Sequence, residues 1–446
     1  MSLVQARLKY LIELKEKPVQ NLLYENENST IPRRSLLKGG LATGVIALLS
    51  GCESRVDLRV RKGLKRPVGV SDRSWKNIRS QFILKRGVTY MNNASLGMPP
   101  AIVAEAVCEG YETISKEPLH GKHGLQEKIL SETVPNLAKT FGAERDEVIL
   151  TRNASEALHM QAAGLKLKQG DEVIITTQEH PAGQRPWMFR QKRDGIVVKE
   201  VFIPSPLESA DDVMERFEDA ITKRTRAISF CHVTRGGHHY PVKKLASMAR
   251  DHGLVTLVDG AQAAGQFPID LKDLGCDTYA VSLHKWMLAP AGTGFLYVRK
   301  DSREKIRSIF APNPIIEKAP DFDPPGTKDF PVRAAIGTAL DFVNTLGVEN
   351  IEKRCRFLSD YLKSGLEEIK GVKLLSGQMS DISAPGSTIF EKEGLDAMAS
   401  VPMMEERIGT HIDEHQRDGH NAIRISTHIY NNRAEIDRLL DAIARA

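Results

Sequence analysis

The stretch 254–300 limits the possible folds of this chain more than any other part of its sequence. It contains three short, almost wholly apolar runs, which are 254–258, 278–283 and 294–298. Short apolar runs between turn residues are typical of strands buried on both faces of an open α/β sheet. Ligands of such sheets bind at the carboxyl ends of the strands. Asp259 and Lys285 follow the first and second runs, so we expect them to face a ligand.

A carboxylate and a lysine at neighbouring strand ends suit one type of cofactor chemistry. A lysine amine acts as a nucleophile toward a carbonyl, and pyridoxal phosphate (PLP) supplies an aldehyde. PLP also needs a carboxylate facing its ring nitrogen, so that the ring accepts electrons. Asp259 and Lys285 fit these roles, and Ser282 and His284 flank the lysine as possible donors to a phosphate. The alternative is that Asp259 caps a turn and Lys285 is a solvated lysine.

The complete stretch resembles the class V aminotransferase family of fold-type I PLP enzymes. The resemblance is carried by the motif DGAQ at 259–262, by SLHKW at 282–286 and by the tail APAGTGFLYVR at 289–299. It implies an α/β fold with a mostly parallel seven-stranded sheet, helices on both faces and a smaller α/β C-terminal domain. It also implies PLP as the cofactor, with Gln262 among the residues that bind it.

Three further segments imply the rest of the cofactor site. The sequence RNASE at 152–156 follows a predicted strand and opens a helix, whose first amides suit an anion. In the family this turn holds the PLP phosphate, which implies that role for Ala154 and Ser155. The histidine of the family's E-H-x-A element stacks on the ring, so His180 is implied to stack there and to relay protons. Thr327, in a G-T-x-D loop, is implied to reach the phosphate of a partner subunit in a homodimer.

The resemblance also implies residues for the substrate. Asn93 lies in the segment that lines the family's substrate entrance, and Arg424, followed by Tyr430, matches the arginine that binds an α-carboxylate with its planar fork. Arg235 stands where cysteine desulfurases carry an asparagine. Because an unpaired buried guanidinium is costly, we expect Arg235 to pair either with a protein carboxylate or with the distal carboxylate of a substrate. The second alternative predicts a preference for acidic or peptide-linked acidic substrates.

The nearest resemblance within the family is to the isopenicillin N epimerase-like branch. We therefore expect an enzyme that acts at the α-carbon or amino group of an amino acid or peptide-like amine, as a transaminase or an epimerase. A PLP-dependent lyase and a non-catalytic binding protein are the alternatives. Cysteine desulfurases need a nucleophilic cysteine shortly before the carboxylate-binding arginine, and no cysteine lies between Glu405 and Arg424. The sequence therefore disfavours a desulfurase.

Composition excludes some other partners. The net charge of +5 is small for 446 residues, and no basic cluster follows the N-terminal region, which argues against nucleic acid. The five cysteines have no metal-binding spacing, and we expect those at 108, 231, 276 and 355 to be buried free thiols. His238 and His239 are adjacent and have no further ligand at a suitable spacing, so no metal site is predicted.

The N-terminus contains a twin-arginine pattern, IPRRSLLK at 31–38, followed by a short apolar stretch that ends in LSGC at 49–52. The stretch is too short for an ordinary transmembrane helix. It resembles a twin-arginine signal with a lipobox, in which Cys52 is lipidated. We thus expect a periplasmic enzyme that contacts the membrane only through its signal or lipid.

Domain boundaries follow from these patterns and from the changes in composition along the chain. The predicted parts are the signal at 1–52, a linker at 53–72, an N-terminal segment at 73–100, a large PLP-binding domain at 101–325 and a small C-terminal domain at 326–446. Further strands are predicted at 147–151, 171–176 and 226–233, and helices at 101–111, 332–346 and 351–369.

Changing the signal tests the predicted location. Replacing both Arg33 and Arg34 by lysine should keep the protein inside the cell, because the pair is the feature of the signal that directs export. Cys52→Ser should remove the lipid but leave the enzyme outside. Cell fractionation with immunoblotting measures both outcomes, and a full-length wild-type protein in the cytoplasm would contradict the prediction.

Overall fold

The computed structural model describes residues 64–310, 323–377 and 379–446. The twin-arginine pattern and the predicted lipidation site at Cys52 lie outside the described residues. Within the described part of the chain, no helix is both long and apolar enough to cross a membrane.

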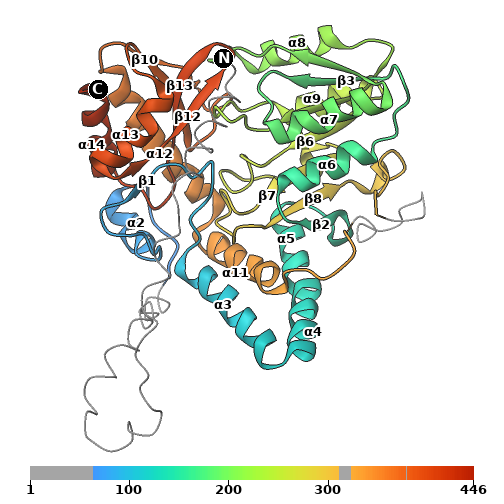
Figure 1. Cartoon of the computed structure of the whole chain (residues 1–446), viewed down its shortest axis with the longest axis horizontal. Helices are drawn as coiled ribbons and strands as arrows, with labels where there is room; N and C mark the ends of the chain where they lie inside the picture. Colours follow the sequence, from blue (N-terminus) through green and yellow to red (C-terminus); the bar gives the residue numbers. More distant parts are fainter. Residues whose placement is uncertain (1–63, 311–322, 378) are drawn as a thin grey trace, which may run out of the picture. The chain divides into compact units, whose positions relative to one another are not determined.

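A seven-stranded sheet forms the centre of the fold, in the order β2-β8-β7-β6-β5-β3-β4. Figure 1 labels five of its strands, β2, β8, β7, β6 and β3. Its strands are β2 (Val148–Thr151), β3 (Glu172–Thr176), β4 (Val197–Val201), β5 (Thr225–Cys231), β6 (Val255–Asp259), β7 (Thr278–Ser282) and β8 (Gly294–Val298). All neighbours from β7 to β4 are parallel, whereas β8 is antiparallel to both β2 and β7. The predicted mostly parallel seven-stranded sheet is confirmed.

Helices cover both faces of this sheet, which explains the apolar strand sequences. Ala280 of β7 packs with α6 (Ala154–Gly164) and α7 (Pro181–Asp194) on one face. Its neighbour Tyr279 packs with α8 (Ala210–Ala220) and α9 (Val242–Asp251) on the other. Successive side chains of a strand point to opposite faces, so a strand covered on both sides needs an apolar residue at nearly every position.

A second, four-stranded sheet lies in the C-terminal part of the chain and has the order β12-β13-β10-β9. Its strands are β9 (Val372–Leu374), β10 (Ser387–Lys392), β12 (Asp413–Arg417) and β13 (His420–Ser426), and all of them pair antiparallel. The helices in this part are α12 (Val348–Glu367), α13 (Ala397–Ile408) and α14 (Arg433–Ala444). Phe390, Ile425 and Leu439 belong to the core that joins these helices to the sheet. The expected smaller C-terminal α/β part is confirmed.

The N-terminal segment is attached to the C-terminal part. It contains α2 (Asp72–Arg79) and β1 (Thr89–Tyr90), and β1 pairs in parallel with β11 (Thr410–His411). A bridge between Asn92 and Ser426 continues this attachment toward the second sheet.

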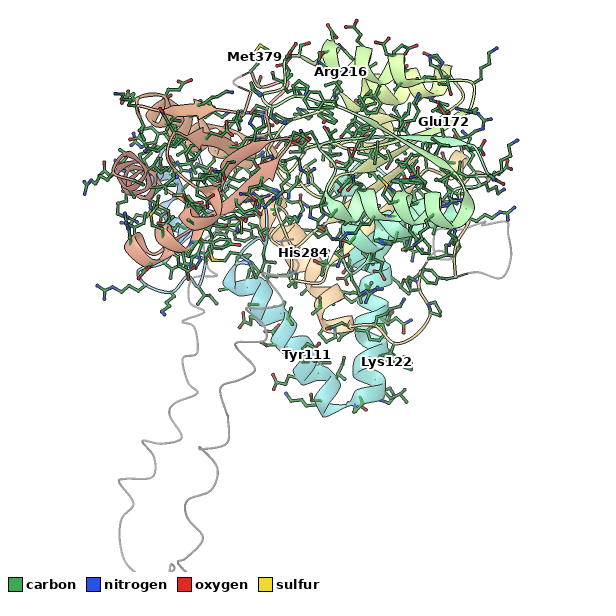
Figure 2. All side chains as sticks on the ribbon, turned by 45° about the horizontal axis from the view of Figure 1, so that its top comes forward. Tyr111, Lys122, Glu172, Arg216, His284 and Met379 are labelled. Carbon is green, nitrogen blue, oxygen red and sulfur yellow. The ribbon has the colours of Figure 1, made fainter. Side chains whose placement is uncertain are left out.

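Two long helices extend from the central sheet as a hairpin, α3 (Ala101–Lys116) and α4 (Pro118–Lys128), which carry Tyr111 and Lys122 (Figure 2). The helix α11 (Phe330–Leu346) packs on α3, where Gly110 allows close approach of Pro331. The remaining short elements are η4 (Ile129–Thr133), α5 (Val134–Thr140), η5 (Arg145–Glu147), α10 (Leu271–Leu274) and η6 (Lys300–Ser302). The predicted domain boundary at 325/326, just before α11, stays a prediction.

Gly260 provides a test of how closely the two strands that carry the site approach each other. A Cβ atom at Gly260 would lie 1.9 Å from Cε1 of Tyr279. Because Tyr279 is fully buried and cannot move aside, Gly260→Ala should cost about 1–3 kcal/mol of stability and lower the midpoint of urea unfolding.

Gly124→Ala is the matched control, because nothing lies within 4 Å of a Cβ added at this position in α4. Alanine in a helix is favoured over glycine by about 0.5–1 kcal/mol, so this variant should match or exceed the wild-type midpoint. A Gly260→Ala protein as stable as Gly124→Ala would contradict the close packing.

Candidate active site

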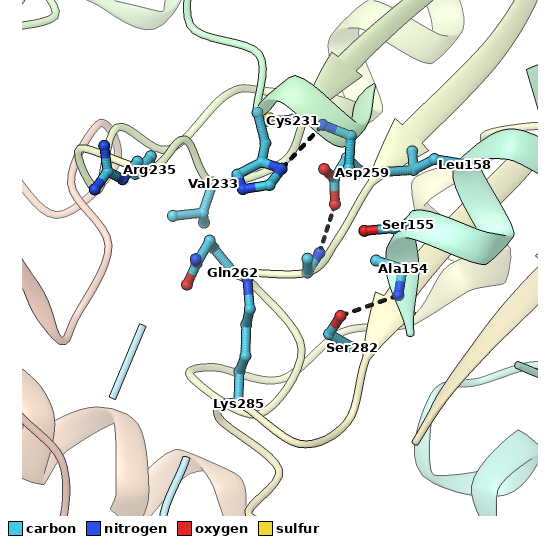
Figure 3. Close-up of a pocket in the computed structure, with 13 residues that line it drawn as sticks. Ala154, Ser155, Leu158, Cys231, Val233, Arg235, Asp259, Gln262, Ser282 and Lys285 are labelled. Carbon is cyan, nitrogen blue, oxygen red and sulfur yellow. Dashed lines mark hydrogen bonds between the residues drawn. The ribbon is translucent and has the colours of Figure 1, made fainter. Parts of the chain in front are cut away.

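A pocket lies at the carboxyl ends of the central strands, as the sequence predicts for an open α/β sheet (Figure 3). Its lining residues come from α6, the start of α7 and the segments that follow β5, β6 and β7. They are Ala154, Ser155, Leu158, His180, Ala182, Cys231, Val233, Arg235, Asp259, Ala261, Gln262, Ser282 and Lys285. Eight of them are residues that the sequence singles out for a PLP site, namely Ala154, Ser155, His180, Arg235, Asp259, Gln262, Ser282 and Lys285.

Lys285 follows β7, and its position is fixed by the backbone around it. The carbonyl oxygen of His284 accepts a hydrogen bond from the backbone N–H of Gly97 at 2.8 Å, and Gly97 packs directly against the carbonyl of Lys285. Burial lowers the pKa of the Lys285 amine to about 8, and the positive charges of Arg424 and Arg235 act in the same direction. Asp259 opposes them. A substantial fraction of the amine is therefore neutral, and thus nucleophilic, near physiological pH.

Asp259 ends β6 and lies buried on the floor of the pocket. Its Oδ1 accepts a hydrogen bond from the backbone N–H of Ala261 at 2.9 Å. Burial raises the pKa of the Asp259 carboxyl, whereas the Ala261 N–H and the charge of Lys285 lower it. A buried carboxylate gains most from a cationic partner in the same pocket.

The N-terminus of α6 provides donors suited to an anion. Asn153 caps the helix by accepting from the N–H of Glu156 at 2.9 Å. The hydroxyl oxygen of Ser282 accepts from the N–H of Ala154 at 3.0 Å, which brings β7 and α6 together at this point. Ser155 lies in the same turn and faces the pocket (Figure 3). The turn thus combines backbone amides, hydroxyls and the positive end of a helix dipole.

His180 stands at the start of α7 beside the pocket. Its Nδ1 accepts a hydrogen bond from the N–H of Ala182 at 3.1 Å, so the proton of the neutral ring is on Nε2. Burial, followed by the charges of Lys285 and Arg235, lowers the pKa of His180 to about 4. At neutral pH the ring is therefore an uncharged donor.

Gln262 lines the pocket, and both ends of its side-chain amide form hydrogen bonds within the protein. Its Oε1 accepts from Nε1 of Trp286 at 2.8 Å, and its Nε2 donates to the carbonyl of Ala94 at 2.8 Å. These bonds hold the segment after β6 against the segment after Lys285 and leave one N–H of the amide for a ligand.

Cys231, which lines the pocket, forms a hydrogen-bonded pair with Glu179, and neither residue is among the predicted site residues. The thiol of Cys231 donates to Oε2 of Glu179 at 3.1 Å, and Thr176 donates to Oε1 at 2.6 Å. Burial and then the nearby Asp259 raise the pKa of Glu179 to about 7. The signal that could have revealed the pair is the position of Glu179 immediately before His180 in the E-H-x-A element.

The expectation for the cysteines is partly wrong. Cys231, Cys276 and Cys355 are buried, whereas Cys108 is exposed on the outer side of α3. An apolar stretch of a surface helix has an exposed face as well as a buried one, and Cys108 lies on the exposed one.

Four predicted residues, His284, Asn93, Thr327 and Arg424, lie outside the pocket lining. The ring of His284 contacts the carbonyl of Thr293 through Nδ1 at 3.0 Å rather than the cavity. Asn93 is buried, and its Oδ1 accepts from the hydroxyl of Tyr430 at 2.8 Å. Thr327 is exposed. The predicted binding roles of all four stay predictions, and that of Thr327 depends on a partner subunit.

Arg235 finds protein carboxylates, which is one of the two alternatives open to it. Its Nη2 lies 3.0 Å from Oε1 of Glu414 and 3.2 Å from Oδ2 of Asp413. Since β12 supplies these counter-charges, the structure shows the first alternative, and Arg235 no longer gives a reason to expect a preference for acidic substrates. Arg424 likewise pairs with Asp413, and it also donates to Oδ1 of Asn92 at 3.2 Å.

The hairpin formed by β12 and β13 reaches the segment that carries His180. Arg417 donates to the carbonyls of Thr177 and Glu179, and Gln178 donates to the carboxylate of Asp418. The second sheet thus contributes the hairpin that borders the pocket of the first.

The two adjacent histidines have different partners. Nε2 of His238 contacts the carbonyl of Leu375 at 3.1 Å, whereas Nε2 of His239 contacts Nε2 of His232 at 3.0 Å. Among the residues that the structure describes, no group of three or more His, Cys, Asp or Glu side chains is arranged to hold a metal ion.

The family model of class V aminotransferases matches residues 89–439, and the chain belongs to this family. Isopenicillin N epimerase of Amycolatopsis lactamdurans is 29% identical over 390 residues, which cover 83% of this chain and 98% of the relative. A probable cysteine desulfurase of Synechocystis sp. is also 29% identical, over 392 residues that cover 82% of this chain and 92% of the relative. Sequence similarity therefore gives no ground to exclude desulfurases.

Solved structures confirm the fold-type I architecture. The cystine C–S lyase C-DES, in complex with its product cysteine persulfide, superposes with a TM-score of 0.74 at 24% identity, covering 80% of this chain and 98% of the lyase. The cysteine desulfurase of Thermococcus onnurineus superposes with the same TM-score of 0.74 at 22% identity, covering 83% and 97%.

PLP is the cofactor of this family, and the pocket residues fit it. The buried Asp259 suits a protonated ring nitrogen, the turn of Ala154, Ser155 and Ser282 suits a phosphate, and the amine of Lys285 suits an aldehyde. PLP carries a ring nitrogen, a phosphate and an aldehyde, so one ligand can bind all three groups.

The pKa of Lys285 predicts how cofactor uptake depends on pH. Only the neutral amine attacks the aldehyde, and burial depresses the pKa from its ordinary 10.5 to about 8. The neutral fraction should therefore rise about tenfold between roughly pH 7 and pH 9 and then level off, whereas an unperturbed lysine would gain about a hundredfold without levelling. The rate of PLP uptake by cofactor-free protein, followed by absorbance, measures this profile.

Asp259→Asn serves as the internal comparison. Because the charge of Asp259 raises the pKa of Lys285, its removal should move the midpoint of the uptake profile to lower pH. A wild-type midpoint above about pH 10, or a shift of the variant to higher pH, would contradict the assignment.

Proposed function

We propose that this protein is a PLP-dependent enzyme that acts at the α-carbon or amino group of an amino acid or peptide-like amine, as a transaminase or an epimerase. The observation that carries the proposal is the convergence of a buried lysine of lowered pKa, a buried carboxylate and a helix N-terminus on one pocket. A non-catalytic binding protein has no need of a nucleophilic lysine, since an ordinary lysine binds anions more strongly in its charged form.

The roles of the residues follow from their protonation. PLP bound in the pocket supplies an electron sink next to the substrate amine. Lys285, with its pKa of about 8, holds and returns a proton at the substrate α-carbon near neutral pH. His180, which lines the same pocket, offers a neutral N–H. An acid–base group on each side of the α-carbon is what an epimerase requires, whereas a transaminase needs one.

Arg424 and Asn93 are proposed to contact the substrate. Arg424 is only 2% exposed, and its Nε–H has no hydrogen-bond partner among the described residues. The Nδ2 group of the fully buried Asn93 also lacks a partner there. Buried donors without acceptors are costly, and a ligand oxygen would satisfy them.

Cleavage of a carbon–sulfur bond is the second candidate, since relatives described as cysteine desulfurases favour it. A desulfurase needs a thiolate that accepts sulfur. Among the described cysteines, only Cys231 lines the pocket; its thiol is bonded to Glu179, and burial raises its pKa well above the ordinary value. A buried thiol of raised pKa is a poor nucleophile. Elimination without a protein thiolate, as in a lyase, is therefore the more favourable form of this candidate.

We also propose a homodimer in which the loop with Thr327 reaches the partner's cofactor. The exposed position of Thr327, outside the pocket of its own chain, agrees with this arrangement. The small-molecule substrate class is that of the family, and export by the twin-arginine route remains our proposal for the location.

Incubation of the cofactor-loaded enzyme with a panel of amino acids in deuterated water tests the proposal. Deuterium at the α-carbon, measured by mass spectrometry, reports proton abstraction whatever the final product. Lys285→Ala should lower this exchange on the order of 10²–10⁴-fold, the usual contribution of a positioned acid–base group. Lys243→Ala is the control, because that lysine is paired with Asp273 on the protein surface.

Sulfide release, assayed in parallel, separates the two candidates. It is measured directly with cysteine, and with cystine after a thiol reductant is added to the stopped reaction to free sulfide from the persulfide product. Exchange without sulfide supports the proposed function, and sulfide formation that survives Cys231→Ser supports the lyase. Undiminished exchange in Lys285→Ala, or no reaction with any substrate, would contradict a catalytic role for the pocket.

A further inference from the structure

Asp413 occupies the place where a substrate carboxylate would be expected to approach Arg424. The two residues are directly opposite each other in the antiparallel pair of β12 and β13, so their side chains share one face of the sheet. Oδ2 of Asp413 accepts from Nη2 of Arg424, and the same oxygen lies 3.2 Å from Nη2 of Arg235. The pairing is thus built into the register of the two strands.

The carboxylate of Asp413 is held by a third donor as well. Its Oδ1 accepts from the backbone N–H of Glu414 at 3.1 Å. Both oxygens are therefore bonded, and the group cannot turn away from Arg424 without losing at least one of its charge-assisted bonds. A free carboxylate that enters this region meets a fixed negative charge.

The charges of Arg424 and its three nearest charged partners cancel. Arg424 and Arg235 are balanced by Asp413 and Glu414, and the pairs are largely removed from solvent. Like charges brought together in a partly desolvated site repel each other strongly. These four side chains therefore offer an incoming carboxylate hydrogen-bond donors but no net positive charge of their own.

The donors that remain are accompanied by an acceptor. The Nε–H of Arg424 and the Nδ2 group of Asn93 are buried without partners in the described part of the chain, and Asn92, the neighbour of Asn93, bonds Arg424 directly. Asp413 adds a carboxylate next to them. Donors beside a fixed acceptor are complementary to an amide, which presents a C=O and an N–H together.

We propose that Asp413 makes this enzyme select amines whose neighbouring carbonyl belongs to an amide, such as amino-acid amides and the N-terminal residues of peptides, over amines with a free α-carboxylate. In this arrangement the amide oxygen accepts from Arg424 and the amide N–H donates to Asp413. The inference rests on the proposed function, because it names the substrate class of that activity; Arg235, which pairs with Asp413, is the member of this cluster that lines the pocket.

Two pairs of ligands test it on the cofactor-loaded enzyme. Propanamide and propanoate cannot react because they lack the amine, and NMR titration gives their dissociation constants. Alaninamide and alanine carry the amine, and their α-proton exchange in deuterated water is measured separately. The wild-type protein should bind propanamide at least about tenfold more tightly than propanoate, a difference of about 1.4 kcal/mol.

Asp413→Asn removes the negative charge with little change of shape. It should shift the ratio of the two dissociation constants toward propanoate by about tenfold to a hundredfold. Glu414→Gln is the matched control, because it removes one charge from the same strand at a residue that contacts Arg235 but makes no hydrogen bond or ion pair with Arg424. Its shift should stay below about threefold.

Tighter binding of propanoate to the wild-type protein would overturn the inference, and so would equal shifts in the two variants. The wild-type ranking decides this even if a variant fails to fold. Absence of α-proton exchange with both alanine and alaninamide would instead contradict the proposed function. The dissociation constants of propanamide and propanoate would still show whether the amide or the carboxylate binds more tightly. Exchange with alanine but not with alaninamide would leave the proposed function standing and reject the preference for amides.

Discussion

The desolvation of Lys285 is the constraint on which the rest of the pocket depends. Burying an ammonium group is costly, and the protein reduces this cost by lowering its pKa to about 8. Asp259 acts against this by favouring the charged form, so the balance between burial and one carboxylate sets the state of the amine. The ends of the strands and the turn of α6 form the pocket around this amine, and the second sheet contacts the segment that carries His180.

The elements with the strongest sequence signal are those buried on both sides. The predicted strands at 254–258, 278–283 and 294–298 correspond to β6, β7 and β8 within one residue at each end. The edge strand β4 was not predicted, because its sequence VVKEV includes two charged residues and none of its residues is buried. An edge strand needs no continuous apolar run, so its signal resembles that of a polar connection.

The site was predictable where a single segment carries both the residue and its place in the sheet. Asp259 is the last residue of β6, Lys285 and His180 lie shortly after β7 and β3, and parallel strands bring their carboxyl ends to one edge. The partners of Arg235 were not predictable, because Asp413 and Glu414 come from a different sheet some 180 positions later in the chain. Nothing local in the sequence indicates which strand of one sheet will face a loop of another.

The parallel pairing of β1 with β11 has a consequence for the order in which the protein is completed. Thr89 pairs with Thr410. During synthesis β1 therefore has no pairing strand until the ribosome has made the chain as far as β11. Domains generally begin to fold from the N-terminus as the chain lengthens, but here the segment before the central sheet stays unpaired until the end. Truncation before Thr410 therefore removes the partner of β1 as well as α14.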